Sequence, residues 1–208
     1  MVMEDREEAM READEKAMPT RRAVLQAALG TAAVATLLSS LYVGAGLIPR
    51  VTKTPENEPP QEGDILVYAT GAKMNQPILT SDLAEGGPFQ LAFPMDPKTK
   101  VIRNKEPKNT LLVLKQPPGS YDAKVAAHAA QGVVCYSAIC THLGCTVSLW
   151  DAAQKLMRCP CHGALYDPRQ DRVVSGPAPQ ALAQLPIRLE GAQIVVAGAF
   201  LGPVGAQV

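Results

Sequence analysis

Two short boxes of cysteine and histidine constrain the fold of this chain more than any other feature. The first reads Cys-Thr-His-Leu-Gly-Cys over residues 140–145, and the second reads Cys-Pro-Cys-His-Gly over residues 159–163. Together they hold four of the five cysteines and two of the three histidines, with 16 residues between His142 and Cys159. Such spacings suit two tight loops that each aim a Cys and a His at one centre.

Three kinds of site fit these residue types. Cys and His side chains ligate iron–sulfur clusters, and a structural zinc ion accepts the same ligands. Cysteines also pair as plain disulfides, which would leave the histidines free. The residue types alone leave all three open, so the flanking sequence has to decide between them.

The flanking sequence carries a family resemblance. The two boxes, the Tyr166-Asp167 pair and the Gly-Pro-Ala-Pro segment at 176–179 closely resemble the Rieske iron–sulfur subunit of cytochrome bc-type quinol–cytochrome c oxidoreductases. The resemblance is specific over about residues 132–190, whereas residues 64–130 agree only in general β character. It implies an all-β fold, in which a Rieske-type antiparallel β domain with a small cluster-binding subdomain follows one N-terminal transmembrane helix.

The resemblance also implies one [2Fe–2S] cluster, with two thiolates on one iron and two imidazoles on the other. The ligands would be Cys140 and Cys159 on the first iron, and His142 and His162 on the second. The remaining box cysteines, Cys145 and Cys161, would form a disulfide that clamps the two boxes over the cluster. His162 and His142 would contact quinol and accept its proton, and His162 is the preferred contact.

A further set of residues is expected to line or support the cluster: Leu143, Gly144, Gly163, Ala164, Tyr166, Gly176 and Pro177. By resemblance, Leu143 would shield the exposed edge, and the Gly-Pro-Ala-Pro segment would be a rigid cover because proline fixes φ. The family's ubiquinol-oxidising members commonly have serine where this chain has Ala164, whereas Tyr166 is retained. Loss of one hydroxyl donor lowers the reduction potential, which favours menaquinol as the substrate.

A long uncharged run precedes this region. The 27 positions from Ala23 to Pro49 contain no charged residue. As a helix they would extend about 40 Å, which exceeds the hydrocarbon core of about 30 Å. We therefore predict a transmembrane anchor over residues 23–49. The alternative is a cleaved signal peptide, with a small-residue cleavage site at residues 43–45.

The segment before this run indicates the cellular location of the protein. Thr20-Arg21-Arg22 resembles a twin-arginine export signal, which is the preferred interpretation; positive-inside flanking charge is the alternative. Residues 1–22 are predicted to be a cytoplasmic tail. The predicted location is the cell (plasma) membrane, crossed once, with the cluster domain on the extracytoplasmic or periplasmic side, where a disulfide is permitted.

The rest of the chain divides into a linker and a domain. Residues 50–63 contain Pro55, Pro59 and Pro60 and are predicted to be a hinge linker of up to about 45 Å. Residues 64–208 are predicted to form the Rieske domain, with the cluster-binding subdomain at about 132–185. Within it we expect strands at 65–69, 89–93, 111–114 and 132–137, a short helix at 122–130, and a hairpin at 187–197. The fifth cysteine, Cys135, is predicted to be a buried, inert thiol.

These features predict a membrane-anchored Rieske electron-transfer subunit of a quinol–cytochrome c oxidoreductase. Its expected partners are a cytochrome b subunit, a c-type cytochrome, quinol and the membrane; the formal net charge of zero gives no sign of nucleic acid. The alternative is the Rieske small subunit of a periplasmic molybdenum oxidase of the arsenite oxidase kind, which cleavage near Ala45 would favour. A ring-hydroxylating oxygenase or its ferredoxin fits less well, because that class is cytoplasmic and lacks the spare cysteine pair.

Overall fold

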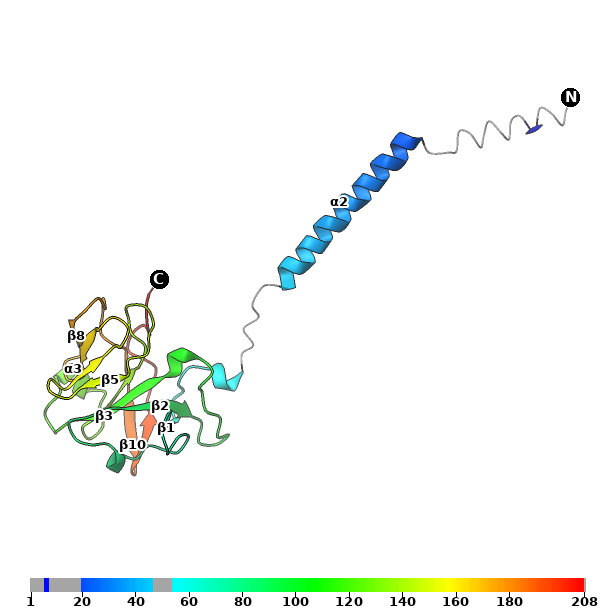
Figure 1. Ribbon diagram of the computed structural model, residues 1–208. Coiled ribbons are helices and arrows are strands. Elements are labelled where there is room, and N and C mark those ends of the chain that lie inside the picture. The colour runs from blue at the N-terminus through cyan, green and yellow to red at the C-terminus, as the bar shows by residue number, and fades with distance from the viewer. Residues whose placement is uncertain (1–5, 8–19, 47–53, 208) are drawn as a thin grey trace. The chain divides into compact units, whose positions relative to one another are not determined.

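The computed structural model describes residues 6–7, 20–46 and 54–207 (Figure 1). It divides into two compact units, Met1–Thr52 and Lys53–Val208; we call the second unit the head. Most of the predicted tail, the end of the predicted anchor at 47–49 and the start of the predicted linker at 50–53 lie outside the described residues.

The N-terminal unit contains one long helix, α2, over Arg21–Gly46. By length and composition its Arg21–Val43 part can cross a membrane, and a signal sequence at this position meets the same criteria. The hydroxyl groups of Thr31, Thr36 and Ser40 donate to backbone carbonyls one turn earlier, at 2.8–3.0 Å. Because these polar groups are satisfied within the helix, they add little cost to its transfer into lipid.

The head is built on a seven-stranded antiparallel sheet in the order β10-β11-β1-β2-β3-β4-β9. Its strands are β1 (Ile65–Tyr68), β2 (Gln90–Met95), β3 (Leu111–Lys115), β4 (Val133–Ser137), β9 (Gln184–Leu185), β10 (Ile187–Glu190) and β11 (Gln193–Val196). The two edge strands, β9 and β10, are separated in the chain only by Pro186. Opposite edges of the sheet therefore lie one residue apart, which requires the sheet to curl into a near-barrel.

The central strands bury side chains on both faces. Successive residues of a strand point to opposite sides. Leu111 and Val113 of β3 accordingly pack with β1 and β11 in one apolar cluster. Leu112 and Leu114 pack in a second cluster, which also contains Tyr166 and the box cysteines 140 and 159. The outer face of the sheet is thus the floor on which the cysteine–histidine boxes are built.

A second antiparallel sheet covers that floor. It has four strands in the order β5-β6-β7-β8: β5 (Leu149–Asp151), β6 (Leu156–Arg158), β7 (Leu165–Asp167) and β8 (Arg172–Ser175). In Figure 1 this sheet, marked by β5 and β8, lies at the end of the head opposite β10. All four strands fall inside the predicted cluster-binding subdomain.

The helices of the head are short. They are α3 (Ala123–Ala126) and the 3₁₀ turns η1 (Pro55–Asn57), η2 (Thr80–Asp82) and η3 (Pro107–Asn109). Of the helix predicted over 122–130, only the first turn forms. Val125 is the one buried residue of α3, so little apolar burial is available to stabilise a longer helix.

The all-β prediction is confirmed, although some strand bounds differ from the predicted ones. Strands occur at 65–68, 90–95, 111–115 and 133–137, and the hairpin pairs Ile187 with Val196. The four strands of the smaller sheet were not predicted from the sequence. Cys135, on β4, is buried and unpaired as predicted, and burial raises the pKa of its thiol.

The head begins earlier than predicted. Residues 54–63, the described part of the predicted linker, belong to the same compact unit as the β-sheets. Pro60 is buried there, and the Arg103 side chain donates to the carbonyl of Pro55 at 3.0 Å. Hydrogen bonds to the head hold this stretch, which its proline content alone could not indicate.

Candidate metal centre

The first box forms a closed loop, residues 140–145, which we call loop 1. The Gly144 N–H donates to the Cys140 carbonyl at 3.0 Å, and the Cys140 N–H donates to the Cys145 carbonyl at 2.8 Å. Gly144 has φ of 80°, a left-handed conformation that glycine adopts without steric cost. Loop 1 follows β4, so the sheet fixes where its first cysteine starts.

The second box forms a loop of the same design, residues 159–164, which we call loop 2. The Gly163 N–H donates to the Cys159 carbonyl at 3.1 Å, and the Cys159 N–H donates to the Ala164 carbonyl at 2.9 Å. Loop 2 connects β6 to β7, and its glycine again has positive φ, 73°. The glycine in each box is therefore required by the turn that presents the Cys and His side chains.

The two loops bring their thiols inside and their imidazoles outside. Cys140 and Cys159 are unpaired and only 2% and 1% exposed. His162 is exposed and His142 half-buried, and their ring centroids lie 4.7 Å apart. Two thiols and two imidazoles from two facing loops form the donor set of a [2Fe–2S] centre with mixed ligands.

One orphaned atom supports this fit. The Nδ1 atom of His142 is buried and has no hydrogen-bond partner. A buried nitrogen without a partner is costly unless it binds something. Burial also raises the pKa of the Cys159 thiol, so that thiol is a poor free nucleophile and becomes a thiolate on binding metal. The residues present fit an iron–sulfur cluster.

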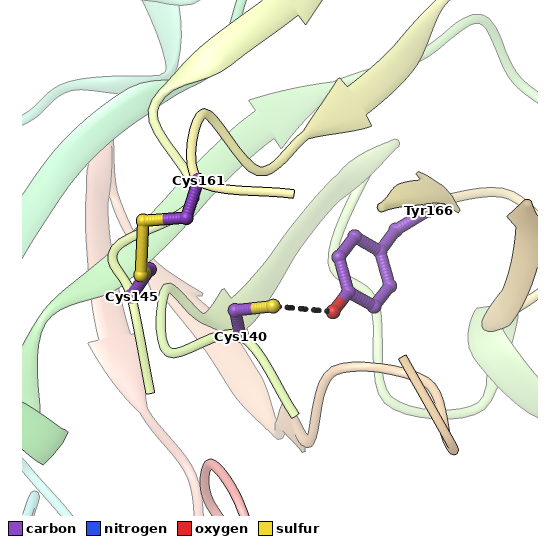
Figure 2. Close-up of a disulfide and its surroundings, with 4 residues drawn as sticks. All are labelled: Cys140, Cys145, Cys161 and Tyr166. Carbon is purple, nitrogen blue, oxygen red and sulfur yellow. Dashed lines mark hydrogen bonds between the residues drawn. A yellow bond between two sulfur atoms is a disulfide. The ribbon is translucent and has the colours of Figure 1, made fainter. Parts of the chain in front are cut away.

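The other two box cysteines form a disulfide. Cys145 of loop 1 is bonded to Cys161 of loop 2, with their Cα atoms 6.6 Å apart. Figure 2 shows this disulfide on one side of Cys140 and Tyr166 on the other. The sulfur of Cys159 lies within 4.8 Å of both disulfide sulfurs. Since those two sulfurs are bonded to each other, Cys159 alone of the three is available to iron.

The Tyr166 hydroxyl points at the Cys140 sulfur (Figure 2), at 3.1 Å. This hydroxyl also accepts from the Thr141 N–H at 3.4 Å. A Cys140 thiolate has no proton, so toward it the tyrosine would be the donor. Burial, and then the contact with Cys140, raises the pKa of Tyr166, so the hydroxyl stays protonated and able to donate. Hydrogen bonds to ligand sulfur raise the potential of an iron–sulfur centre.

The Gly-Pro-Ala-Pro segment packs directly on loop 2. A Cβ atom on Gly176 would lie 2.6 Å from the Cα of Ala164, and Gly176 has φ of 94°. Ala164 is fully buried and Ala178 nearly so, whereas Pro177 is exposed. The segment therefore supports the second loop from behind, and only glycine permits this close approach.

An apolar tip remains open beside the histidines. Leu143 is 66% exposed although loop 1 is otherwise anchored. Gly144 and Pro177 are also exposed, and Gly163 is half-buried. Leu143, Gly144 and Gly163 thus lie in the two boxes, and Pro177 lies in the segment that packs on loop 2. Tyr166 and Ala164 are buried.

Thr141 was not recognised in the sequence. It is buried and donates its hydroxyl to the Gln180 carbonyl at 2.6 Å, which ties loop 1 to the end of the Gly-Pro-Ala-Pro segment. Its position between two box residues was the one available signal. The partner lies 39 residues away, so no local pattern could identify it.

Comparison with known proteins agrees with this geometry. The family model of the Rieske [2Fe-2S] domain matches residues 81–186. The cytochrome bc1 complex Rieske iron-sulfur subunit of Streptomyces lividans is 34% identical over 135 residues, which are 63% of this chain and 79% of that protein. A Haloferax mediterranei Rieske subunit, named for a respiratory nitrate reductase, is 33% identical over 85% of this chain and 74% of its own length.

Other relatives match over shorter stretches. The cytochrome b6-f complex iron-sulfur subunit of Chlorobaculum tepidum is 41% identical over 36% of this chain and 40% of that protein. The plasma membrane Rieske protein of Synechocystis PCC 6803 superposes with a TM-score of 0.36 and 23% identity, over 52% of this chain and 86% of that one. The family match covers just over half of the 208 residues and contains both boxes. The chain therefore belongs to the Rieske [2Fe–2S] domain family and carries one cluster of that type.

Proposed function

We propose that this chain is the membrane-anchored Rieske subunit of a cytochrome bc-type quinol–cytochrome c oxidoreductase. The observation that carries the proposal is the open tip of the two loops. The ring of the exposed His162 lies 4.7 Å from that of His142, which the exposed Leu143 follows in the chain. An apolar ring with a hydroxyl group, such as quinol, matches a surface that offers one imidazole and a leucine. The relatives named for bc1 and b6-f complexes support the assignment.

The ligands in this proposal are Cys140, Cys159, His142 and His162. A bound [2Fe–2S] cluster supplies the site that accepts one electron. The His162 imidazole, through the nitrogen that does not face the metal, accepts a hydrogen bond and then a proton from the quinol hydroxyl. His142, with its Nδ1 buried, is the ligand better protected from solvent.

Two buried residues near the ligands, Tyr166 and Ala164, set the midpoint potential of the cluster in this proposal. Tyr166 donates to the Cys140 sulfur and stabilises the added negative charge. Ala164 is buried and offers no hydroxyl group of its own. We therefore propose a potential below that of ubiquinol-oxidising relatives, matched to menaquinol. Ala164→Ser should raise the midpoint potential, and an unchanged midpoint would contradict the role of this position.

The location follows from α2 in this proposal. The helix is the anchor, and the preceding arginines direct the head to the extracytoplasmic side of the plasma membrane. There it would take electrons beside a cytochrome b subunit and pass them to a c-type cytochrome. The head would move between these partners on the chain that precedes it.

The experiment uses the full-length chain in its membrane complex. A redox titration followed by low-temperature electron paramagnetic resonance should give a Rieske spectrum, and at alkaline pH the midpoint should fall by about 59 mV per pH unit for one proton per electron. Co-purification with cytochrome b and reduction of cytochrome c by menaquinol should accompany it. A midpoint that does not vary with pH would overturn proton uptake by histidine.

A second candidate is a Rieske subunit that serves another terminal oxidoreductase. The Haloferax mediterranei relative favours it, since that protein matches 85% of this chain. The periplasmic molybdenum oxidase of the arsenite oxidase kind belongs to this class. Recovery of the chain with a soluble oxidoreductase, free of cytochrome b and shortened near Ala45, would support this candidate over the first.

A further inference from the structure

A buried arginine fastens the proline-rich stretch before β1 to the head. We call residues 54–64 the neck. Arg103, in the loop between β2 and β3, donates from Nε to Asp64 Oδ2 and from Nη1 to Glu58 Oε2, both at 2.8 Å. Its Nη1 also donates to the Pro55 carbonyl at 3.0 Å. One side chain therefore holds the start, the middle and the end of the neck.

Backbone contacts complete the attachment. The Asn109 side-chain amide donates to the Glu58 carbonyl at 2.6 Å, and the Lys105 N–H donates to the Glu56 carbonyl at 3.2 Å. The Gly63 N–H donates to the Val196 carbonyl of β11 at 3.0 Å. Prolines limit the helical structure of the neck to the 3₁₀ turn η1. The carbonyl groups of Pro55, Glu56 and Glu58 accept hydrogen bonds from the rest of the head.

The charges at this contact are largely removed from water. The Arg103 and Asp64 side chains are 7% and 3% exposed, whereas Glu58 is half exposed. Burial alone would lower the pKa of Arg103, but hydrogen bonds and charge from Asp64 and Glu58 leave that pKa above its ordinary value. Removal of the guanidinium would leave the buried Asp64 carboxylate without a counter-charge, with the Gln61 N–H still donating to it at 2.8 Å, and this favours release of the neck from the head.

We propose that Arg103 is a positioning residue that sets the length of the tether between α2 and the head. With the clasp closed, the part of the chain fixed to the head begins at Pro55; with the clasp open, it begins at Gly63, whose N–H stays bonded to Val196 of β11. The eight residues released, 55–62, correspond to about 26 Å of extended chain. This inference rests on the proposed function, in which the head travels between two partners.

A longer tether lowers the effective concentration of the head at each docking site. Effective concentration falls roughly as the −3/2 power of tether length once the span is exceeded. Lengthening the sequence between α2 and the fixed part of the head from residues 47–54 to residues 47–62 therefore predicts an about threefold loss of turnover. The midpoint potential should stay unchanged, because Arg103 contacts neither loop 1 nor loop 2 among the described hydrogen bonds and ion pairs.

The first test measures the clasp itself in the full-length membrane complex. A glutamate-specific protease can cut after Glu56 or Glu62, and a cut at either site releases the head from α2. In Arg103→Gln the release should be at least about tenfold faster than in wild type. Arg169→Gln is the matched control, since it breaks an Arg–Asp pair of the head that does not involve the neck. Release of Arg103→Gln at the wild-type rate would overturn the clasp.

The second test measures length. In the Arg103→Gln complex, menaquinol-driven reduction of cytochrome c should fall about threefold, with the paramagnetic signal and midpoint potential kept. Deletion of residues 56–60 in that background should restore part of the lost turnover. A freed neck whose length does not affect turnover would overturn the length-setting role. A wild-type complex that does not oxidise quinol would instead contradict the proposed function, while the protease result would still stand.

A milder variant covers the case in which Arg103→Gln loses its cluster. Glu58→Gln removes the negative charge of a half-exposed partner of Arg103 and leaves the Arg103–Asp64 pair intact. It should accelerate head release by a smaller factor, with the paramagnetic signal unchanged. If the neck is cut at the wild-type rate in this variant and Arg103→Gln does not fold, the clasp is rejected.

Discussion

Loop 1 and loop 2 close with the same pair of backbone hydrogen bonds, yet they are secured in different ways. Loop 1 ends at Cys145, which is tied covalently to Cys161. Loop 2 ends at Ala164, which is buried beneath the backbone of Gly176. The backbone thus sets how each loop presents its ligands, whereas the surroundings set how firmly it is held. The disulfide holds both loops, because Cys161 belongs to loop 2, whereas packing against Gly176 supports loop 2 alone.

The largest effect is expected from removal of the covalent support. Cys145→Ser together with Cys161→Ser should lower the free energy of unfolding by about 3 kcal/mol, because the bridge spans 16 residues and restricts the unfolded chain. Urea unfolding of the full-length protein measures the change. Dithiothreitol should cause the same loss in wild type and none in the double variant; an equal response in both would contradict this account.

Removal of the packing support should have a somewhat smaller effect. Gly176→Ala forces a Cβ to within 2.6 Å of the Ala164 backbone, and overpacking of this kind costs about 1–3 kcal/mol. Gly119→Ala is the matched control, since Gly119 also has positive φ, 78°, but has nothing within 4 Å of the added atom. The two variants should differ in unfolding free energy and in the shape of the paramagnetic signal; equal behaviour would reduce the effect to backbone strain.

An ion pair at the end of β7 depends on pH, whereas a disulfide does not titrate. Asp167 ends β7, and although burial alone would raise its pKa, hydrogen bonds from Arg169 hold that pKa below the ordinary 3.8. A carboxylate with a lowered pKa contributes stability above its unfolded pKa and loses it as pH falls through the folded value. The stability gap between wild type and Asp167→Asn should therefore be about 1–2 kcal/mol at neutral pH and narrow below pH 3.8.

Circular dichroism of chemical unfolding between pH 7 and acid conditions checks this prediction. A gap that stays constant over the whole range would mean that Asp167 contributes by shape rather than by charge.

The smallest predicted effect is on the midpoint potential of the cluster rather than on the stability of the fold. Tyr166→Phe removes the hydroxyl at 3.1 Å from the Cys140 sulfur and should lower the midpoint potential by about 40 mV, which corresponds to one hydrogen bond of about 1 kcal/mol. Tyr136→Phe is the control, because the equally buried Tyr136 hydroxyl donates to the Pro168 carbonyl at 2.7 Å. Redox titration should move only the first variant.

Local patterns were enough to predict part of this molecule. The strands with continuous apolar runs, such as Leu111–Lys115 and Val133–Ser137, were identified because burial on both faces leaves a strong signal. The box residues were identified because cysteine and histidine at short spacing are rare outside metal sites and disulfides. The disulfide itself was expected from family resemblance rather than from spacing.

The rest depends on contacts between distant residues. Strands such as Leu149–Asp151 have three residues and no buried one, so neither run length nor alternation identifies them. Arg103 and Asp64 are 39 residues apart, and the prolines of the neck predict a free linker when read alone. In each case the deciding partner is supplied by tertiary structure.

The burial of β3 and β4 on both faces has a mechanical consequence. The neck enters the head at Arg103 and β11, while the metal centre is attached to the outer face of the central strands. A force applied through the neck is borne first by the arginine clasp and by β1 and β11. Tension on the tether therefore strains the sheet rather than loop 1 or loop 2. The reduction potential of the cluster is expected to stay the same while the head is under tension.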